Sequence, residues 1–304
     1  MKKILQKVLI VMIFLTGLSL LLYPFVSNVW NTYRQSKLIT TYDQIVNEQP
    51  EEKDYSAEWE RARNYNVALM DKKLPDFIAE SSDHETPDSE YMACLNLYGD
   101  GMMGYVEIPK IDTKLPVYHT TDDEVLQKAA GHLEGSSLPV GGEGTHAVIC
   151  AHRGLPNAAL FIDLDKLTVG DHFLIYILDE ILCYEVDQIL VVEPHETECL
   201  AAEEGLEYVT LMTCTPYGVN SHRLMIRGHR VPYEPEVEAV MQEETAGAVQ
   251  NSAHTDYLLW MITGLVIMAL FLIVLLVVDK VFYKHRSVSG KETGEVRCKD
   301  KELE

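Results

Sequence analysis

Basic residues are few in this sequence, and the common metal-binding patterns are missing from it. The 304 residues include 25 Lys and Arg against 47 Asp and Glu, which gives a formal net charge of −22. An acidic surface repels nucleic acid, which argues against a nucleic-acid-binding function. The six cysteines form no Cys-x-x-Cys pair, and no His-x-x-x-His pair accompanies them. A zinc site is therefore not expected.

Charged residues are also absent from two long stretches near the ends of the chain. Val8 to Val26 is a mainly apolar run of 19 residues, and Tyr257 to Val278 is one of 22. Each can cross a hydrocarbon layer of about 30 Å as a helix that rises about 1.5 Å per residue. The first run exceeds the apolar core of a typical signal peptide, and no small-x-small cleavage pattern follows before Trp30. It is interpreted as an uncleaved anchor, and the second run as another span.

Positive charges beside the two runs predict their orientation. Basic residues precede the first run and follow the second, namely Lys2, Lys3, Lys7, Lys280, Lys284 and Arg286. Both termini are therefore expected in the cytoplasm, with residues 27–256 on the outer side of a cell membrane. This outer segment holds 15 basic and 41 acidic residues. Its length suits one ordinary domain with appended segments.

The cysteines of the outer segment are odd in number. Cys298 lies in the predicted cytoplasmic tail, which leaves Cys94, Cys150, Cys183, Cys199 and Cys214 outside. At least one outer thiol is therefore expected to lack an internal disulfide partner.

Residues 28–100 have a helical part and an irregular part. The pattern is helical from Asn28 to about Met70, with an interruption around Gln49 and Pro50. In the second helical piece one apolar stripe, suited to packing against another body, is formed by Trp59, Ala62, Tyr65 and Leu69. Residues 71–100 are polar and predict a long loop, a lid or a linker.

After Gly99 the sequence changes to short β-like runs separated by turn residues. The clearest runs are GYVEI (104–108), LPVY (115–118), HAVICA (146–151), HFLIYIL (172–178), ILCYEVDQILVVE (181–193), EYVTLMT (207–213) and RLMIR (223–227). Only Asp179 and Glu180 separate the fourth run from the fifth, which predicts a tight hairpin. The spacing favours a mainly β fold, a closed barrel of about eight strands.

These features divide the chain into six parts. The predicted boundaries are 1–27 for the cytoplasmic tip and first anchor, 28–100 for the helical segment and lid loop, 101–233 for the β-barrel, 234–256 for an acidic stalk, 257–278 for the second span and 279–304 for the tail.

The segment TLMTCTPYGVNSHRLMIR (210–227) contains the first candidates for catalysis. One β-run ends at Cys214, a turn-rich stretch follows, and the next run starts at Arg223. If the two runs pair as antiparallel neighbours, the thiol faces the guanidinium. A fixed cation lowers the pKa of a cysteine, and an arginine can stabilise an oxyanion, so this pairing suits a nucleophilic cysteine.

A cysteine nucleophile also needs a proton shuttle, usually a histidine close in space. His152 closes the run HAVICA at a strand end and is the candidate, although His222 and His229 compete with it and Arg227 competes with Arg223. A lone cysteine is more often a buried apolar residue, and a histidine there is more often a turn residue. Residue patterns alone leave these choices open.

An extended resemblance decides between them. THAVICAHRGLPNAALFIDLDKLTVGDHF (145–173) resembles the catalytic-histidine region of the class C, pilin-assembling sortases, and YVTLMTCTPYGVNSHRLMIRGHR (208–230) resembles their Cys-to-Arg signature. The similarity covers nearly all of residues 104–230, and the two-span topology is similar as well. Carried over position by position, it implies that His152, Cys214 and Arg223 are the catalytic residues.

The resemblance also implies a reaction and its partners. A hydrolase-type cysteine transpeptidase at the outer face of a Gram-positive cell membrane would cleave an LPXTG-like sorting signal between Thr and Gly. The acyl group on Cys214 would pass to a lysine amine of another pilin subunit. The implied partners are proteins with this signal and the membrane, and no cofactor or metal is implied.

Class C sortases also carry a lid with an Asp-Pro-aromatic motif. At the corresponding place this chain has Leu74-Pro75-Asp76-Phe77, with Pro and Asp exchanged. Asp76 and Phe77 could cover Cys214 and pair with Arg223, or the segment could be an ordinary loop.

Other interpretations stay open at this point. A sortase could anchor surface proteins to peptidoglycan, a processing protease could hydrolyse the same intermediate, and a non-catalytic scaffold could keep the fold. Cys150 lies two residues before His152 and, by strand alternation, on the same face. It is either core packing or a second thiol near the groove.

Overall fold

The computed structural model describes residues 2–47, 54–69 and 88–234, and the isolated positions 241, 262–264, 266, 268 and 269. Its helices are α1 (Lys2–Asn47), α2 (Ser56–Leu69), α3 (Ser89–Ala93), α4 (Asp123–Leu126) and the short 3₁₀ turns η1 (Pro109–Ile111), η2 (Leu164–Lys166) and η3 (Glu198–Leu200). Its strands are β1 (Met102–Ile108), β2 (Thr113–His119), β3 (Ala130–His132), β4 (Thr145–Cys150), β5 (His172–Ile177), β6 (Glu180–Val192), β7 (Glu207–Thr215) and β8 (His222–Val231).

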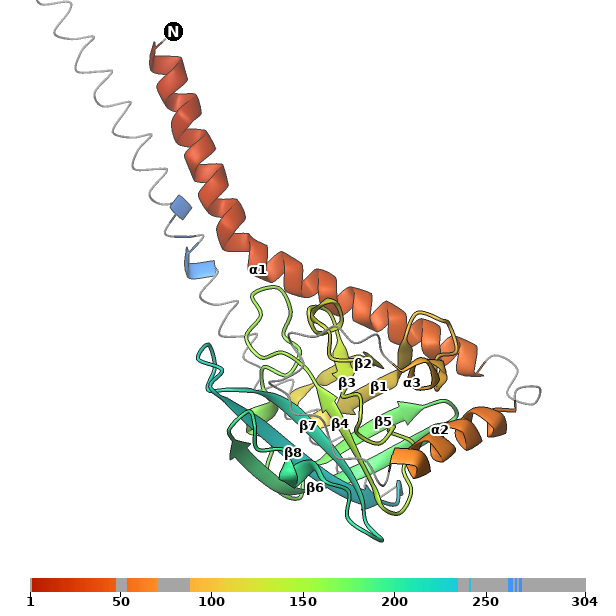
Figure 1. Cartoon of the computed structure of the whole chain (residues 1–304). Helices are drawn as coiled ribbons and strands as arrows, with labels where there is room; N and C mark the ends of the chain where they lie inside the picture. Colours follow the sequence, from red (N-terminus) through yellow and green to blue (C-terminus); the bar gives the residue numbers. More distant parts are fainter. Residues whose placement is uncertain are drawn as a thin grey trace, which may run out of the picture. The chain divides into compact units, whose positions relative to one another are not determined.

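The eight strands of the described region form one closed barrel, as predicted. Their order around the barrel is β1-β2-β3-β4-β7-β8-β6-β5, and β5 pairs with β1 to close it (Figure 1). Two neighbouring pairs, β2–β3 and β4–β7, are parallel, and the others are antiparallel. Parallel neighbours need a crossover connection, so the chain leaves β4 and forms β5 and β6 before it returns as β7.

Three details differ from the expectations. The strand β3 was not predicted, because three residues are too few to show an alternating pattern. The predicted hairpin exists, but Ile177 pairs with Glu180, so its turn residues are Leu178 and Asp179. The side chain of Leu178 is buried, which favours the pairing of Ile177 with Glu180. Leu178 keeps this place although its backbone has a positive φ of 50°. The predicted loop 71–100 contains the short helix α3, capped by the Asp88 side chain.

The barrel interior is filled by alternate residues of the strands. Members of this core, all buried, include Val106, Val117, Ile149, Ile175, Leu211 and Ile226. The predicted stripe of α2 joins the same core, since Trp59, Ala62, Tyr65 and Leu69 are all buried in it. The indole N–H of Trp59 also donates to Asp179 in the β5–β6 turn, at 2.9 Å. The sequence periodicity of α2 therefore reflects a real packing face.

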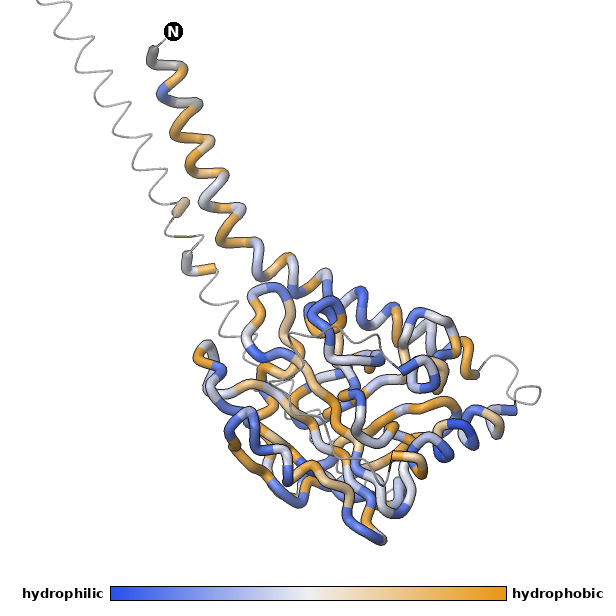
Figure 2. The backbone as a smooth tube through the Cα atoms, viewed as in Figure 1, coloured by the Kyte–Doolittle hydropathy of each residue, from blue (hydrophilic) through white to orange (hydrophobic). Residues whose placement is uncertain are grey.

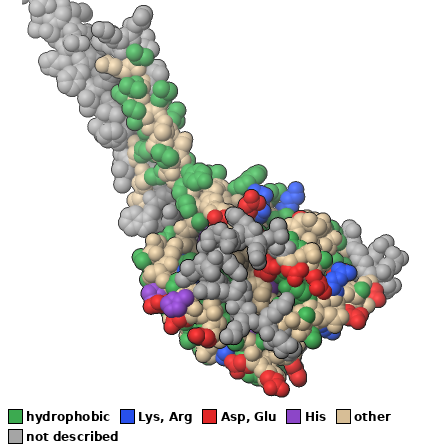
Figure 3. Space-filling model, in the orientation of Figure 1, with side chains coloured by type: hydrophobic (Ala, Val, Ile, Leu, Met, Phe, Trp, Pro, Cys, Tyr) green, Lys and Arg blue, Asp and Glu red, His purple; other side chains and the backbone are tan. Residues whose placement is uncertain are grey.

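Helix α1 changes character along its length. Its N-terminal part is apolar and exposed (Figures 2 and 3). Over Leu9–Val46, α1 is the one helix in the described residues that is long and apolar enough to cross a membrane. Its C-terminal part instead packs on the barrel, where Ile39, Tyr42 and Val46 contact a cluster that includes Met102 and Tyr105.

Several predicted segments lie outside the described residues. They are the lid residues Asp76 and Phe77 and, apart from isolated positions, the stalk 234–256, the second span 257–278 and the tail 279–304. The second span and the orientation of the termini stay predictions.

Tyr42 joins α1 to two strands. Its hydroxyl donates to the carbonyl of Met103 at 3.0 Å and accepts from the N–H of Leu178 at 2.8 Å. All three residues are buried. A buried polar group without a partner costs about 1–3 kcal/mol, so this hydroxyl matters to the docking of α1.

We expect Tyr42→Phe to lower the free energy of unfolding by about 1–3 kcal/mol, because it leaves two buried backbone groups unpaired. Urea unfolding of the full chain in detergent micelles measures this change. Tyr33→Phe, at an exposed position of the same helix, is the matched control. Equal unfolding midpoints for the two variants would contradict the assignment.

A buried histidine links the β3 region to α3. The Nδ1 atom of His132 lies 2.9 Å from the Tyr91 hydroxyl, and its Nε2 atom lies 2.8 Å from the carbonyl of Ser137. A carbonyl only accepts, so Nε2 carries the proton and Nδ1 accepts from Tyr91. Complete burial lowers the pKa of His132 to about 4. The ring is therefore neutral in the folded protein at physiological pH.

This neutral ring predicts that acid destabilises the fold. Between pH 6.5 and about 4 the unfolded chain binds a proton at His132 that the folded protein excludes. The contribution of His132 is complete above pH 6.5 and is lost on acidification, by about 3 kcal/mol in total. His146, whose pKa burial also lowers to about 4, adds to the slope.

Urea unfolding of His132→Gln across this pH range tests the idea, with His195→Gln at an exposed position as control. The stability of His132→Gln should depend less on pH than that of the control. Identical slopes would exclude His132 as a contributor.

Candidate active site

The predicted pairing of Cys214 with Arg223 is confirmed. Cys214 lies next to the end of β7, and in the antiparallel β7–β8 pair its register partner is Arg223. Val209 and Leu211 of β7 and Leu224 of β8 belong to the interior core. Because side chains alternate along a strand, Cys214 and Arg223 lie on the outer face of the barrel.

His152 follows β4 on the other side of β7. In the parallel β4–β7 pair Cys150 is opposite Met212, and the N–H of Ala151 still donates to the Met212 carbonyl at 3.1 Å. The hydroxyl of Thr213 donates to the Ala151 carbonyl at 2.7 Å. Two residues further in the same register, His152 comes level with Cys214. The predicted residues thus occupy one end of three neighbouring strands, which are spaced about 5 Å apart.

Two of the competing side chains, Arg227 and His229, lie elsewhere, whereas His222 is opposite Thr215 at the same strand end as Cys214. Arg227 is level with Thr210 and forms a two-point ion pair with Asp187, with distances of 3.0 and 2.8 Å. His229 pairs with Tyr208 at the opposite end of β7. His222 is next to Arg223 in β8, where its Nδ1 contacts the Ser221 hydroxyl. Among the candidates, the register brings only Arg223 directly opposite Cys214.

The outer face below these residues carries an apolar floor. It consists of Leu133, Val148, Cys150, Leu200, Met212 and Met225, all buried. Both interpretations of Cys150 hold, because this thiol packs in the floor and also lies on the face that carries Cys214. Burial raises the pKa of Cys150 to about 12, so it keeps its proton.

Burial also raises the pKa values of the other described thiols apart from Cys214. Desolvation raises the pKa of Cys94 and of Cys183 to about 11 and raises that of Cys199. All five cysteines of the described residues are free. A thiolate is the attacking form of cysteine, so these four are poor nucleophiles at neutral pH.

His152 and Arg223 have different electrostatic surroundings. Partial burial lowers the pKa of His152, against a smaller opposite effect of the Asp123 carboxylate. The neutral imidazole is therefore favoured at neutral pH, a form that can accept a proton. The guanidinium of Arg223 is held by the carbonyls of Asn220 and His222, at 3.4 and 3.3 Å. Both contacts keep the Arg223 guanidinium at the strand end where Cys214 lies.

Sequence reasoning missed the residue that ties the two halves of the site together. Arg153, directly after His152, donates to the hydroxyl of Thr215, directly after Cys214, at 3.3 Å. The same guanidinium donates to the Ile162 carbonyl at 3.0 Å and pairs with Asp165 at 2.5 Å. Only 9% of the Arg153 side chain is exposed. In the sequence the available signal is a basic residue directly after the candidate histidine, because burial and contacts become visible only in the folded chain.

A second contact joins the same two segments. Gly154 has a φ of +88°, and a Cβ on it would lie 2.8 Å from the ring of Tyr217. Only glycine fits this backbone conformation and this close approach. Arg153 and Gly154 together hold the loop after β4 against the loop after β7.

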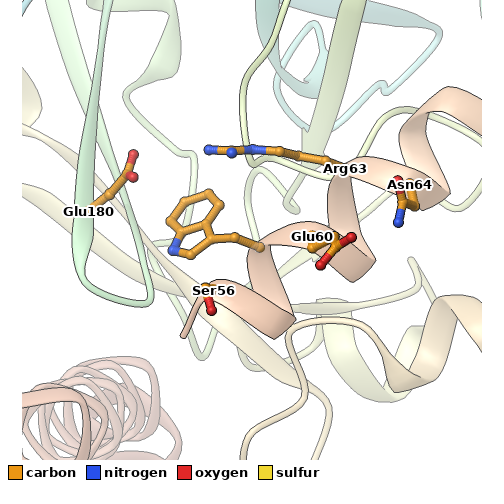
Figure 4. Close-up of a pocket in the computed structure, with 6 residues that line it drawn as sticks. Ser56, Glu60, Arg63, Asn64 and Glu180 are labelled. Atoms are coloured by element: carbon orange, nitrogen blue, oxygen red, sulfur yellow. The ribbon is translucent and has the colours of Figure 1, made fainter. Parts of the chain in front are cut away.

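A hollow of about 400 Å³ lies away from these residues, between α2 and the β5–β6 turn (Figure 4). Its lining is Ser56, Trp59, Glu60, Arg63, Asn64 and Glu180. The guanidinium of Arg63 stacks over the Trp59 ring, 5.3 Å from its centre. None of the predicted catalytic residues contributes to this lining.

Comparisons with known proteins point to one family. A family model described as the Sortase domain matches residues 106–231, a range that includes His152, Cys214 and Arg223. The structure of sortase C1 from Streptococcus agalactiae is 46% identical, with a TM-score of 0.57, and the match covers 65% of this chain and 100% of that one. Sortase C from Streptococcus pneumoniae is 44% identical, with a TM-score of 0.57 and coverage of 65% and 97%.

A curated relative is more distant. Sortase D of Bacillus subtilis (strain 168) is 30% identical over 131 residues, which are 42% of this chain. The match spans 63% of that relative, slightly less than two thirds of its length.

We expect Arg153→Ala to lower kcat by about ten- to a hundredfold with little change in KM, since a displacement of about 1 Å at a catalytic group has effects of this size. Arg153→Lys should recover part of the rate, because it keeps a donor near Thr215. Peptide-cleavage kinetics and urea unfolding measure both variants. Arg61→Ala, an exposed arginine of α2, is the control. A loss of stability that accounts for the whole rate effect would show that Arg153 is only structural.

Proposed function

This chain belongs to the sortase family of cysteine transpeptidases, with class C sortases as its structural relatives, and we propose that it polymerises pilin subunits. Its substrate is an LPXTG-like sorting signal, cleaved between Thr and Gly. The acyl group passes through a thioester on Cys214 to a lysine amine of another pilin subunit.

The main support for this proposal is the register of the three strands β4, β7 and β8. Cys214 and Arg223 face each other across β7 and β8, and His152 leaves β4 on the other side of β7. These three side-chain types are what acyl transfer through a cysteine requires: a nucleophile, an oxyanion donor and a proton shuttle. Their common strand end supports the proposal.

The first half of the reaction forms the thioester. Neutral His152 takes the proton of the Cys214 thiol, and the thiolate attacks the threonine carbonyl of the signal. Arg223 donates hydrogen bonds to the resulting oxyanion. When the C–N bond breaks, His152 returns its proton to the glycine amine, which leaves.

The second half reverses these roles. The lysine amine attacks the thioester carbonyl, His152 accepts a proton from this amine, and the thiolate of Cys214 is the leaving group. An amide is exchanged for another amide of similar energy, so the reaction calls for no cofactor. Two half-reactions on one nucleophile predict ping-pong kinetics.

The membrane location supports a surface substrate. Helix α1 is long and apolar enough to anchor the chain, and we place the barrel outside a Gram-positive cell membrane, with a second span at Tyr257 to Val278. The structure of the Streptococcus pneumoniae relative is described as informative about pilin substrate specificity. This description of a protein with 44% identity supports a pilin as the substrate here.

The test combines a fluorogenic LPXTG-type peptide, the full chain and mass spectrometry of the trapped intermediate. Cys214→Ala should abolish both cleavage and the adduct. His152→Ala should lower kcat by about 10²–10⁴ and Arg223→Ala by about 10²–10³, the usual effects of losing a proton shuttle or an oxyanion donor. Cys199→Ala, which removes another partly exposed thiol, should be active. An adduct that survives Cys214→Ala would overturn the assignment.

The acceptor is tested separately. A lysine-containing pilin segment should accelerate release of the acyl group and yield covalent ladders of pilin. If peptidoglycan amines accelerate it and the lysine does not, the enzyme anchors proteins to the cell wall. If no amine has an effect, the enzyme is a hydrolase.

A further inference from the structure

Helix α1 contacts the loop that follows the candidate catalytic histidine. This loop, called here the His152 loop, comprises residues 153–163 between β4 and η2. The Asn31 side chain donates to the Asn157 carbonyl at 2.6 Å, and the N–H of Ala159 donates to the Asn28 side chain at 2.9 Å. Figure 1 shows the segment after β4 beside α1. Two asparagines one helical turn apart thus fasten the loop to the helix.

The contact lies just beyond the apolar run of α1. Asn28 and Asn31 are two and five residues after Val26, the last residue of that run. At about 1.5 Å per residue they lie roughly 3 and 8 Å beyond its end. The head-group layer of a bilayer is about 5–7 Å thick on each side. The fastening point therefore falls within or at the edge of this layer.

Two aromatic side chains of α1 also suit the depth of the lipid head groups. Trp30 and Tyr33 are each 61% exposed, and their ring centres are 6.3 Å apart. Tryptophan and tyrosine collect at the level of the lipid head groups. The first charged residue after the apolar run is Arg34.

The His152 loop is uncharged between Arg153 and Asp163, as is the segment 208–222. Residues 154–162, GLPNAALFI, carry no charge, although the outer segment 27–256 has 41 acidic residues. Acidic side chains here would be repelled by anionic lipids and would carry a solvation cost at the interface. Pro156 is exposed at the tip. An uncharged tip beside an apolar anchor can approach lipid without these costs.

We propose that the His152 loop rests on the lipid head groups, so that the bilayer surface is a partner of the active site. This inference rests on the proposed anchoring by α1. His152 is five residues from Asn157, at most roughly 17 Å of chain. The catalytic groups therefore work close to the membrane surface.

Fluorescence quenching in phosphatidylcholine nanodiscs tests this position with the full chain. The background carries Cys199→Ala, Cys214→Ala and Cys298→Ala, and the described thiols that are left are buried. A thiol-reactive fluorophore is attached in turn at Pro156→Cys, at Leu15→Cys in the apolar run and at Glu204→Cys. Glu204 precedes β7, whose nine residues separate it from the Cys214 end by about 27 Å.

We expect a spin label on the lipid head group to quench Pro156→Cys several-fold more than Glu204→Cys, and an acyl-chain label to quench Leu15→Cys. Asn28→Ala with Asn31→Ala should lower quenching at Pro156→Cys and leave Leu15→Cys unchanged. The exposed pair Thr32→Ala with Ser36→Ala is the matched control.

The outcomes distinguish a failure of the proposed lipid contact from a failure of the proposed membrane anchor. If Leu15→Cys is quenched but Pro156→Cys resembles Glu204→Cys, the loop does not touch lipid and the inference fails alone. If Leu15→Cys is also not quenched, α1 does not span the bilayer, and both the anchor and the inference fail.

Discussion

The register of β4, β7 and β8 is the constraint on which the rest of the site depends. A shift of one residue in either pair would turn Cys214 or its partners from the outer face to the barrel interior, because side chains alternate along a strand. The buried residues Val209, Leu211 and Leu224 oppose such a shift, since each would have to leave the core. The hydrophobic interior thus determines where the chemistry lies, although none of its residues takes part in it.

The loops after β4 and β7 fix the positions of the candidate side chains more closely than strand pairing alone does. Strand pairing ends near Cys150 and Thr215, and the side chains that follow would otherwise be free to move. Arg153 binds Thr215, the last residue of β7, Gly154 lets Tyr217 pack closely, and α1 holds the other end of the His152 loop. One short loop therefore follows His152, the proposed proton shuttle, and connects it both to β7 and to α1.

The sequence was sufficient for features that depend on local pattern. Alternating apolar residues predicted most strands, and the turn-rich stretch between Cys214 and Arg223 predicted their antiparallel pairing, because only eight residues separate the two. His152 needed the family resemblance, since the parallel β4–β7 pair joins residues about 60 positions apart and leaves no local signal. The contact of Asn31 with Asn157 spans 126 residues and follows from packing alone. Strand β3 was missed because three residues carry too little pattern.

Burial distinguishes Cys214, the proposed nucleophile, from the four other thiols of the described residues. Cys150 and Cys214 lie on adjacent strands and on the same face, two register positions apart. Cys150 is inside the apolar floor, where desolvation raises its pKa to about 12 and keeps it protonated. Cys214 lies where the floor ends, half-buried and opposite a guanidinium. Since a thiolate is the attacking species, the protonated Cys150 is excluded as the nucleophile, and this supports the choice of Cys214 at the boundary of the apolar floor. Two register positions thus separate a packing residue, Cys150, from the proposed nucleophile, Cys214.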